Sequence, residues 1–112
     1  GTSLSGQSIS DSVLVMLGSG WKGIWVSTDG TKIRLQPGVI GTHANIRLLP
    51  YQRKIGPDPA SINSAMIGGI AANNSSGMCC GTAQNSYHTV TSMRIIFADG
   101  AALDTGSPES RK

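Results

Sequence analysis

The sequence predicts an α+β fold in one domain, with a mainly antiparallel sheet flanked by helices. Two pairs of short apolar segments are each joined by an Asp-Gly turn, which is typical of β-hairpins. Between them lies one segment with helical spacing, followed by a long glycine-rich segment without charge. The 112 residues fit one domain, and because only 4% are aromatic the core is expected to be aliphatic and thin.

Three strands are expected in the first third of the chain. Residues 13–17 form an apolar run closed by Gly18, which predicts a buried strand. Residues 24–26 and 32–35 flank Asp29-Gly30 and predict the first hairpin.

A helix and a second hairpin are expected further along. Residues 42–49 space their apolar side chains in a helical manner, with Thr42 as N-cap and Pro50 as the stop. Residues 94–97 and 101–103 flank the second Asp-Gly pair and predict the second hairpin. The order is strand, hairpin, helix, glycine-rich segment and hairpin, which indicates the α+β class.

The glycine-rich segment, residues 57–77, is the strongest functional signal. Residues 59–93 contain no Asp, Glu, Lys or Arg, and small residues dominate. Glycine lets a backbone lie close to a flat or anionic ligand, and main-chain N–H groups and short hydroxyls then donate the hydrogen bonds. A flexible linker is the alternative, but a linker has no need of spaced apolar residues such as Ile62, Met66 and Ile70. We interpret the segment as a ligand cradle.

Residues 1–7, Gly-Thr-Ser-Leu-Ser-Gly-Gln, form a second segment rich in glycine and hydroxyl groups. Three hydroxyl side chains between two glycines are a natural nest for phosphate oxygens. Together with residues 57–77, this segment predicts a phosphate loop beside a cradle for a flat ring.

Charge, hydropathy and cysteine content exclude several classes of protein. The net charge is +3, but the only adjacent basic pairs are Arg53-Lys54 and Arg111-Lys112, without interleaved aromatics, so no nucleic-acid partner is expected. No run approaches the roughly 20 apolar residues of a transmembrane segment. The two cysteines, Cys79 and Cys80, exclude a disulfide framework and favour a reducing compartment, so we expect a cytoplasmic protein, with peripheral membrane association as the alternative.

Residues 18–23 match the G-x-G-x-x-G pattern of a Rossmann dinucleotide site. That site needs a helix at the third glycine and an acidic residue about 20 positions on. Here Gly23 is followed by a strand-like segment and position 43 is a histidine, so we interpret residues 18–23 as a connecting loop.

The Cys79-Cys80 pair could be a vicinal disulfide, a pair of metal ligands or two inert thiols. A zinc or iron–sulfur site needs about four ligands, and only His43 and His88 could supplement the cysteines. We therefore favour inert thiols and expect no metal site. His43 is interpreted as a cap or surface residue, and His88, beside Tyr87, is a weaker candidate for a ligand contact.

Five blocks, in order, resemble the flavin-binding domain shared by p-cresol methylhydroxylase, vanillyl-alcohol oxidase and the D-lactate and glycolate dehydrogenases. The blocks are Gly1-Thr2-Ser3-Leu4-Ser5-Gly6, Gln36-Pro37-Gly38-Val39, Pro57-Asp58-Pro59-Ala60-Ser61, Ile67-Gly68-Gly69-Ile70-Ala71-Ala72-Asn73-Asn74 and Phe97-Ala98-Asp99-Gly100. Residues 77–86 are most similar to large D-2-hydroxy acid dehydrogenases that carry an iron–sulfur region further along the chain. Ile70 and Ser75-Ser76 depart from the family pattern without removing a charge.

The resemblance implies a PCMH-type FAD-binding subdomain that binds FAD non-covalently. We expect residues 1–112 to be a partial domain that starts within the pyrophosphate loop and lacks the cap domain. The chain alone is then expected to hold FAD weakly, with a mobile stretch between Pro57 and Tyr87. No catalytic residue is expected in this chain. The cofactor-binding residues implied are Thr2, Ser3, Leu4, Ser5, Gly6, Gln7, Pro57, Asp58, Pro59, Ser61, Ser64, Ile67, Gly68, Gly69, Ala72, Asn74, Gly77 and Ile95.

Among these residues, the Gly68 and Gly69 N–H groups and the Ser64 side chain are expected at the flavin ring edge, and Ile95 near the adenine. The activity implied is oxidation of a small 2-hydroxy acid such as D-lactate, glycolate or D-2-hydroxyglutarate, with hydride transfer to flavin N5. Substrate arginines and a general-base histidine would come from the cap domain. The alternatives are a flavoenzyme of the same fold acting on another alcohol, and a small binding module without flavin.

Overall fold

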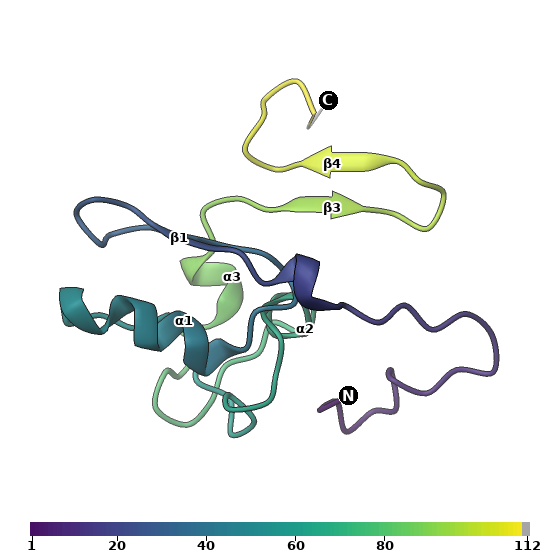
Figure 1. Cartoon of the computed structure of the whole chain (residues 1–112), viewed down its shortest axis with the longest axis horizontal. Helices are drawn as coiled ribbons and strands as arrows, with labels where there is room; N and C mark the ends of the chain where they lie inside the picture. Colours follow the sequence, from purple (N-terminus) through teal and green to yellow (C-terminus); the bar gives the residue numbers. More distant parts are fainter. Residues whose placement is uncertain (111–112) are drawn as a thin grey trace.

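The computed structural model describes residues 1–110 and confirms the α+β class (Figure 1). The basic pair Arg111-Lys112 lies outside the described residues. Four short strands pair as two antiparallel hairpins, β1–β2 and β3–β4, each a separate two-stranded sheet. The elements are, in chain order, η1 (Ser19–Trp21, a 3-10 turn), β1 (Ile24–Val26), β2 (Ile33–Leu35), α1 (Gly41–Leu48), η2 (Leu49–Tyr51, a 3-10 turn), α2 (Ile67–Ala72), α3 (Ser86–Thr89), β3 (Arg94–Ile96) and β4 (Ala102–Asp104).

Both Asp-Gly hairpins form where the sequence predicts them. Val26 pairs with Ile33 in the first hairpin, and Gly30 adopts a φ of 67° in its turn. This left-handed conformation is easily accessible only to glycine, which explains the Asp-Gly signal. Ile95 pairs with Leu103 in the second hairpin, and Gly100 has a φ of 84°.

Helix α1 begins earlier than expected, and the prediction of Thr42 as its N-cap is wrong. Ile40 occupies the cap position, and Thr42 lies inside the helix. The Thr42 hydroxyl lies within hydrogen-bond distance of the Ile62 carbonyl oxygen (3.2 Å) and Asn63 Oδ1 (2.6 Å), so it ties α1 to the glycine-rich segment. The helix ends before Pro50, as expected, and continues as the 3-10 turn η2.

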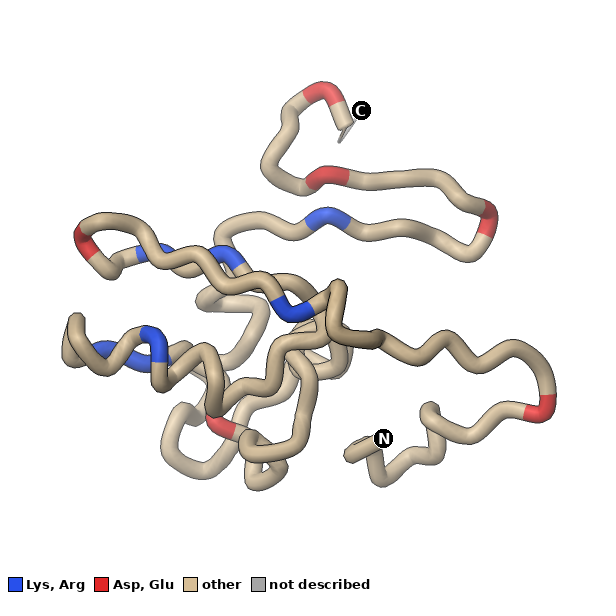
Figure 2. Tube along the Cα trace, viewed as in Figure 1, with Lys and Arg blue, Asp and Glu red and all other residues tan. Residues whose placement is uncertain are grey.

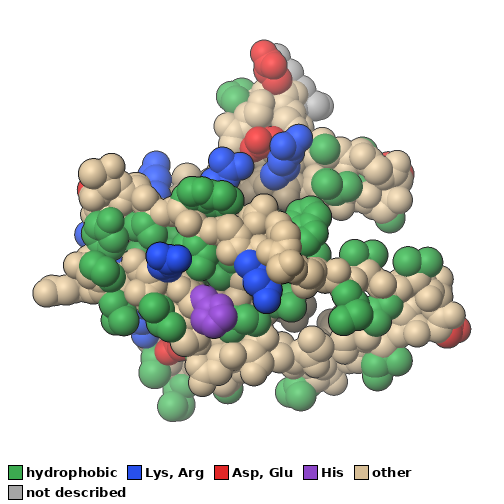
Figure 3. Space-filling view, viewed as in Figure 1, with side chains coloured by type: hydrophobic (Ala, Val, Ile, Leu, Met, Phe, Trp, Pro, Cys, Tyr) green, Lys and Arg blue, Asp and Glu red, His purple; other side chains and the backbone are tan. Residues whose placement is uncertain are grey.

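The prediction of a buried strand at residues 13–17 is wrong. Residues 1–17, which we call the arm, contain no strand, and the side chains of residues 13–16 are between 61% and 83% exposed. The arm makes no hydrogen bond to residues 18–110. A strand needs a neighbour that takes up its N–H and C=O groups, and no described strand runs beside the arm. The arm extends from the body with apolar side chains on its surface (Figures 1 and 3).

The core is small and aliphatic, as the composition predicts. It is centred where the chain after β2 enters α1, and α2 and the turn around Cys80 pack onto it. Its apolar members, each at most 6% exposed, are Val39, Ala44, Leu48, Ala65, Ile70 and Cys80.

Candidate functional site

Helix α2 lies inside the glycine-rich segment and docks onto the chain that leaves β2. The Ile67 N–H donates to the Val39 carbonyl oxygen (2.8 Å), and the Gly68 N–H donates to the Pro37 carbonyl oxygen (2.9 Å). A Cβ on Gly68 would stand 2.8 Å from Pro37 Cβ, so glycine is needed for this close approach. The first turn of α2 is therefore fixed by tertiary contacts.

Gly69, the next residue of α2, has the opposite environment. A Cβ built on Gly69 would meet nothing within 4 Å. Among residues 1–110 its N–H has no hydrogen-bond partner, whereas the Gly68 N–H is already engaged. The expectation that both N–H groups are available to a ring is therefore wrong for Gly68 and remains a proposal for Gly69.

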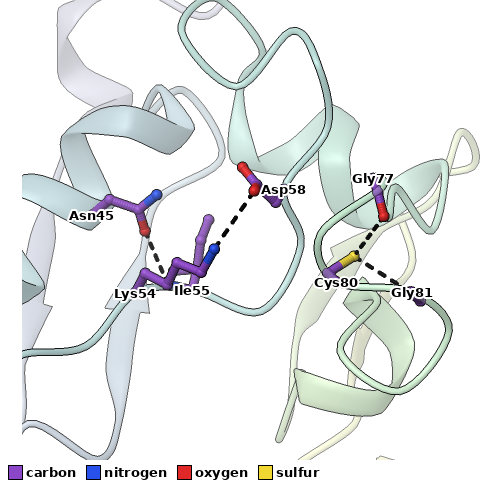
Figure 4. A network of polar contacts seen from close by, with 7 residues as sticks. All are labelled: Asn45, Lys54, Ile55, Asp58, Gly77, Cys80 and Gly81. Carbon is purple, nitrogen blue, oxygen red and sulfur yellow. Dashed lines mark hydrogen bonds and ion pairs between the residues drawn. The ribbon is translucent and has the colours of Figure 1, made fainter.

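The two ends of the glycine-rich segment are joined. The Asp58 N–H donates to the Ser76 carbonyl oxygen (2.8 Å), and the Asp58 carboxylate pairs with Lys54 Nζ at 3.5 Å (Figure 4). Gly77, with a φ of 131°, lies against the Asp58 backbone. Asp58 and Gly77 thus close residues 57–77 into a loop, and the Asp58 charge is directed toward Lys54.

A cleft of about 820 Å³ lies between the arm and α2. Its two walls come from the two segments that the sequence singles out, the glycine–hydroxyl segment at residues 1–7 and the cradle at residues 57–77. The volume falls within the range of about 300–1,000 Å³ that is usual for ligand pockets. The lining residues are Gly1, Thr2, Ser3, Leu4, Ser5, Gln7, Ser8, Leu17, Ser61, Ala65, Met66, Gly68, Gly69, Ile70, Ala72, Asn73 and Ser75.

Half of the expected cofactor-binding positions line this cleft, and the others lie elsewhere. Those on its walls are Thr2, Ser3, Leu4, Ser5, Gln7, Ser61, Gly68, Gly69 and Ala72. Those outside it are Gly6, Pro57, Asp58, Pro59, Ser64, Ile67, Asn74, Gly77 and Ile95.

Three of the positions outside the cleft can be placed from the structure. Asn74 Oδ1 accepts a hydrogen bond from the Tyr87 N–H (3.0 Å), so this side chain is directed to α3. Ser64 is exposed outside the cleft, and Ile95 is half-buried in the second hairpin. Of these three side chains, that of Asn74 is engaged by another part of the fold, and a cofactor contact by Ser64 or Ile95 remains a proposal.

Sequence reasoning missed several lining residues. The expected cofactor-binding residues include Asn74 but not Met66, Ile70, Asn73 or Ser75, all four of which line the cleft. Asn73 and Ser75 belong to the same run of small polar residues as Asn74, so their residue types already marked them as candidates. Which members of that run face the cleft depends on how α2 docks, and composition does not reveal this.

The cleft wall carries no ionisable side chain. Figure 2 shows the trace of α2 and α3 without a charged residue. The polar groups available are hydroxyls, amides and main-chain N–H groups. Ser3 already bonds Gln7, while Thr2 and Ser5 have no side-chain hydrogen bond within residues 1–110. The cleft can therefore bind and orient a neutral ring or a phosphate, but it supplies no acid, base or nucleophile.

A second cavity, of about 530 Å³, lies between the first hairpin and α1. It is lined by Ile24, Val26, Ile46, Arg47, Pro50 and Tyr51. It contains no residue of either glycine-rich segment, so we do not regard it as the cofactor site.

The cysteines and histidines lie outside the cleft. Cys79 is exposed and Cys80 is buried; both are free thiols, which removes the vicinal disulfide from the alternatives. His43 is exposed on α1. His88 Nδ1 lies 2.7 Å from the Thr82 carbonyl oxygen and 3.0 Å from Asn85 Oδ1, so Nδ1 faces acceptors within its own loop and turns away from the cleft. Within residues 1–110, no three His, Cys, Asp or Glu side chains are grouped to hold a metal ion.

The fold is a small α+β domain whose cleft is lined by hydroxyls, amides and main-chain groups without an ionisable side chain. A family model described as "FAD binding domain" matches residues 1–106. The chain belongs to this FAD-binding domain family, and FAD is the cofactor that the family binds. The open position above Gly69 and the free hydroxyls of Thr2 and Ser5 fit such a cofactor.

Two curated relatives are named as an oxidase subunit and a dehydrogenase. The chain is 29% identical over 109 residues to glycolate oxidase subunit GlcD of Escherichia coli K12, covering 96% of the chain and 22% of the relative. It is 27% identical over 111 residues to D-2-hydroxyglutarate dehydrogenase of Haemophilus influenzae, covering 98% of the chain and 11% of the relative. The chain thus spans only a minor part of both. No solved structure gave a significant match. None of the helices within residues 1–110 has the length and apolarity to cross a membrane.

Proposed function

We propose that this chain is the cofactor-holding part of an FAD-dependent oxidoreductase that oxidises a small 2-hydroxy acid such as D-lactate, glycolate or D-2-hydroxyglutarate. The observation that carries the proposal is the shared cleft, in which residues 1–8 and 61–75 form opposite walls without a charged side chain. The family assignment supports FAD, and the names of both relatives support the substrate class.

When bound, FAD supplies the acceptor for the hydride that leaves the hydroxyl-bearing carbon of the substrate. This chain's residues bind and orient the cofactor. Gly69 offers a free N–H and a surface without a side chain, against which a flat ring can lie. Thr2 and Ser5 offer hydroxyl donors to the pyrophosphate, while Met66 and Ile70 form an apolar part of the cleft wall.

The groups that bind the substrate and remove its hydroxyl proton are proposed to lie outside residues 1–112. None of the side chains on the cleft wall is ionisable, so the wall can neither pair a carboxylate nor accept a proton. We propose a cap domain as their source. A cytoplasmic location is also proposed, supported by the two free thiols.

The substrate class is tested by anaerobic addition of D-lactate, glycolate and D-2-hydroxyglutarate to the complete FAD-loaded protein. We expect at least one of them to bleach the visible absorbance of oxidised flavin, because hydride transfer reduces the ring. Matched additions of L-lactate, L-2-hydroxyglutarate and an aromatic alcohol serve as controls. Bleaching by the aromatic alcohol alone would favour another flavoenzyme class, and a protein that takes up no FAD would overturn the proposal.

A further inference from the structure

Ser86 is a buried polar residue, 4% exposed, at the start of α3. Its Oγ lies 3.0 Å from the Ile70 carbonyl oxygen and 3.1 Å from the Ser75 carbonyl oxygen. Its N–H also donates to the Ser75 carbonyl oxygen (3.3 Å). The Ile70 carbonyl oxygen already accepts the Ser75 N–H (2.9 Å), so Ser86 adds a second donor there and supplies the donors to the Ser75 carbonyl oxygen.

A second contact fastens the same loop. Asn74 adopts a φ of 47°, which is uncommon for a residue with a side chain. Its Oδ1 accepts the Tyr87 N–H at 3.0 Å. Ser86 and Tyr87 therefore hold residues 74 and 75 from the α3 side, where the two helices lie close together (Figure 1).

The residues on either side of Asn74 line the cleft instead. Asn73 and Ser75 both belong to its wall, and neither side chain has a hydrogen-bond partner within residues 1–110. The backbone of Ser75 is fully used, because its N–H donates to the Ile70 carbonyl oxygen (2.9 Å) and its carbonyl accepts from Ser86. Only the Ser75 hydroxyl remains for a ligand.

We infer that Ser86 is a positioning residue for FAD binding, which holds the loop at residues 73–75 so that the Asn73 amide and the Ser75 hydroxyl contact the cofactor. This inference rests on the proposed function. A serine that merely caps α2 would stabilise the fold without coupling to the cleft. A positioning serine acts through Ser75, so the two side chains must be coupled in cofactor affinity.

The test is titration of FAD into the complete apoprotein, with binding measured by the quenching of flavin fluorescence. We expect Ser86→Ala and Ser75→Ala each to raise the Kd about tenfold, as expected for one hydrogen bond. The double variant should lose clearly less than about a hundredfold, because Ser86→Ala already displaces the Ser75 hydroxyl that Ser75→Ala removes.

Thr89→Val is the matched control, because within residues 1–110 the Thr89 hydroxyl bonds only the carbonyls of Asn85, the N-cap of α3 (2.8 Å), and of Ser86 in its first turn (3.5 Å). It should leave the Kd unchanged. If Ser86→Ala does not fold, Asn74→Gly replaces it, since glycine keeps the positive φ while removing the acceptor of the Tyr87 N–H, and it too should weaken binding.

Wild-type affinity in Ser86→Ala, or in Asn74→Gly, would overturn the inference while leaving the proposed function standing. Ser86 is only a structural cap if the double variant loses affinity by the product of the two single losses. The same holds if Thr89→Val weakens FAD binding as much as Ser86→Ala does. Absence of FAD binding by the wild-type protein would overturn the inference together with the proposed function.

Discussion

Gly77 lies against Asp58 so closely that a Cβ on Gly77 would stand 1.8 Å from the Asp58 carbonyl oxygen. Gly77 also has a φ of 131°, a conformation that side chains rarely adopt. This contact joins the two ends of the glycine-rich segment and so closes the loop from which α2 presents its residues to the cleft.

We therefore expect Gly77→Ala to lower the free energy of unfolding by more than about 2 kcal/mol, since backbone strain adds to the overlap with Asp58. Gly81→Ala is the matched control. Gly81 also has a positive φ, 54°, but open space around its Cβ position, so its loss should be smaller. Urea unfolding of both variants checks the order, and equal losses would contradict the close contact.

The adjacent glycines of α2 should respond oppositely to alanine. Gly68→Ala places a methyl 2.8 Å from Pro37 Cβ and should destabilise the protein by about 1 kcal/mol or more. The methyl group of Gly69→Ala has no atom within 4 Å to clash with. This change should stabilise the apoprotein by about 0.5–1 kcal/mol, because alanine is the better helix former. Thermal unfolding of the two apoproteins measures this difference. Destabilisation by Gly69→Ala would show that its surroundings are not open.

Asp29 should contribute stability that disappears in acid. Hydrogen bonds from Ser27 Oγ (2.6 Å) and from the N–H (3.1 Å) and Oγ1 (2.8 Å) of Thr31 lower its pKa from the ordinary 3.8. A lowered folded-state pKa stabilises the fold above the unfolded value, and the contribution is lost as pH falls below it.

Asp29→Asn should therefore be less stable than wild type at neutral pH. This gap in the free energy of unfolding should shrink as the pH falls from about 5 to about 2. Denaturant unfolding across this range measures the gap. A gap independent of pH would mean that the carboxylate charge plays no part in the turn.

The two neighbouring thiols should differ in reactivity. Cys79 is exposed, whereas Cys80 is 6% exposed and its Sγ lies 3.3 Å from the Gly81 carbonyl oxygen and 3.5 Å from the Gly77 carbonyl oxygen (Figure 4). A coloured thiol reagent should modify one thiol of the native protein quickly and the second only on unfolding. Cys79→Ser should abolish the fast phase and Cys80→Ser should retain it. Two fast equivalents in the wild type would show that the turn around Cys80 is open.

Local chemistry explains why both hairpins could be predicted. Gly30 and Gly100 supply the positive φ that each turn requires, and this need is visible in the sequence. Helices α2 and α3 are too short for helical periodicity and owe their place to tertiary contacts, such as the bond from the Ile67 N–H to Val39. The strand predicted at residues 13–17 does not form. Apolar composition predicts burial, but it does not supply a partner strand.

The candidate site was predictable as two segments and only partly as residues. Small residues and glycines single out residues 1–7 and 57–77 in the sequence, and residues from both segments line the cleft. Orientation is decided by docking, which engages the Gly68 N–H with Pro37 and leaves the Gly69 N–H free. The resemblance implies Asn74 as a cofactor contact, but the bond from the Tyr87 N–H to Asn74 Oδ1, which engages this side chain, cannot be seen in the sequence.

The central claim, that the cleft between the arm and α2 holds FAD with Gly69 against the ring, is tested most directly by FAD titration of the complete apoprotein and its Gly69→Val variant. Gly20→Val is the control, because Gly20 also has open space around its Cβ position but lies in η1, outside the cleft. We expect the wild type and Gly20→Val to take up one FAD with the same affinity, and Gly69→Val to lose binding while remaining folded. Equal FAD binding by a folded Gly69→Val protein would contradict the account.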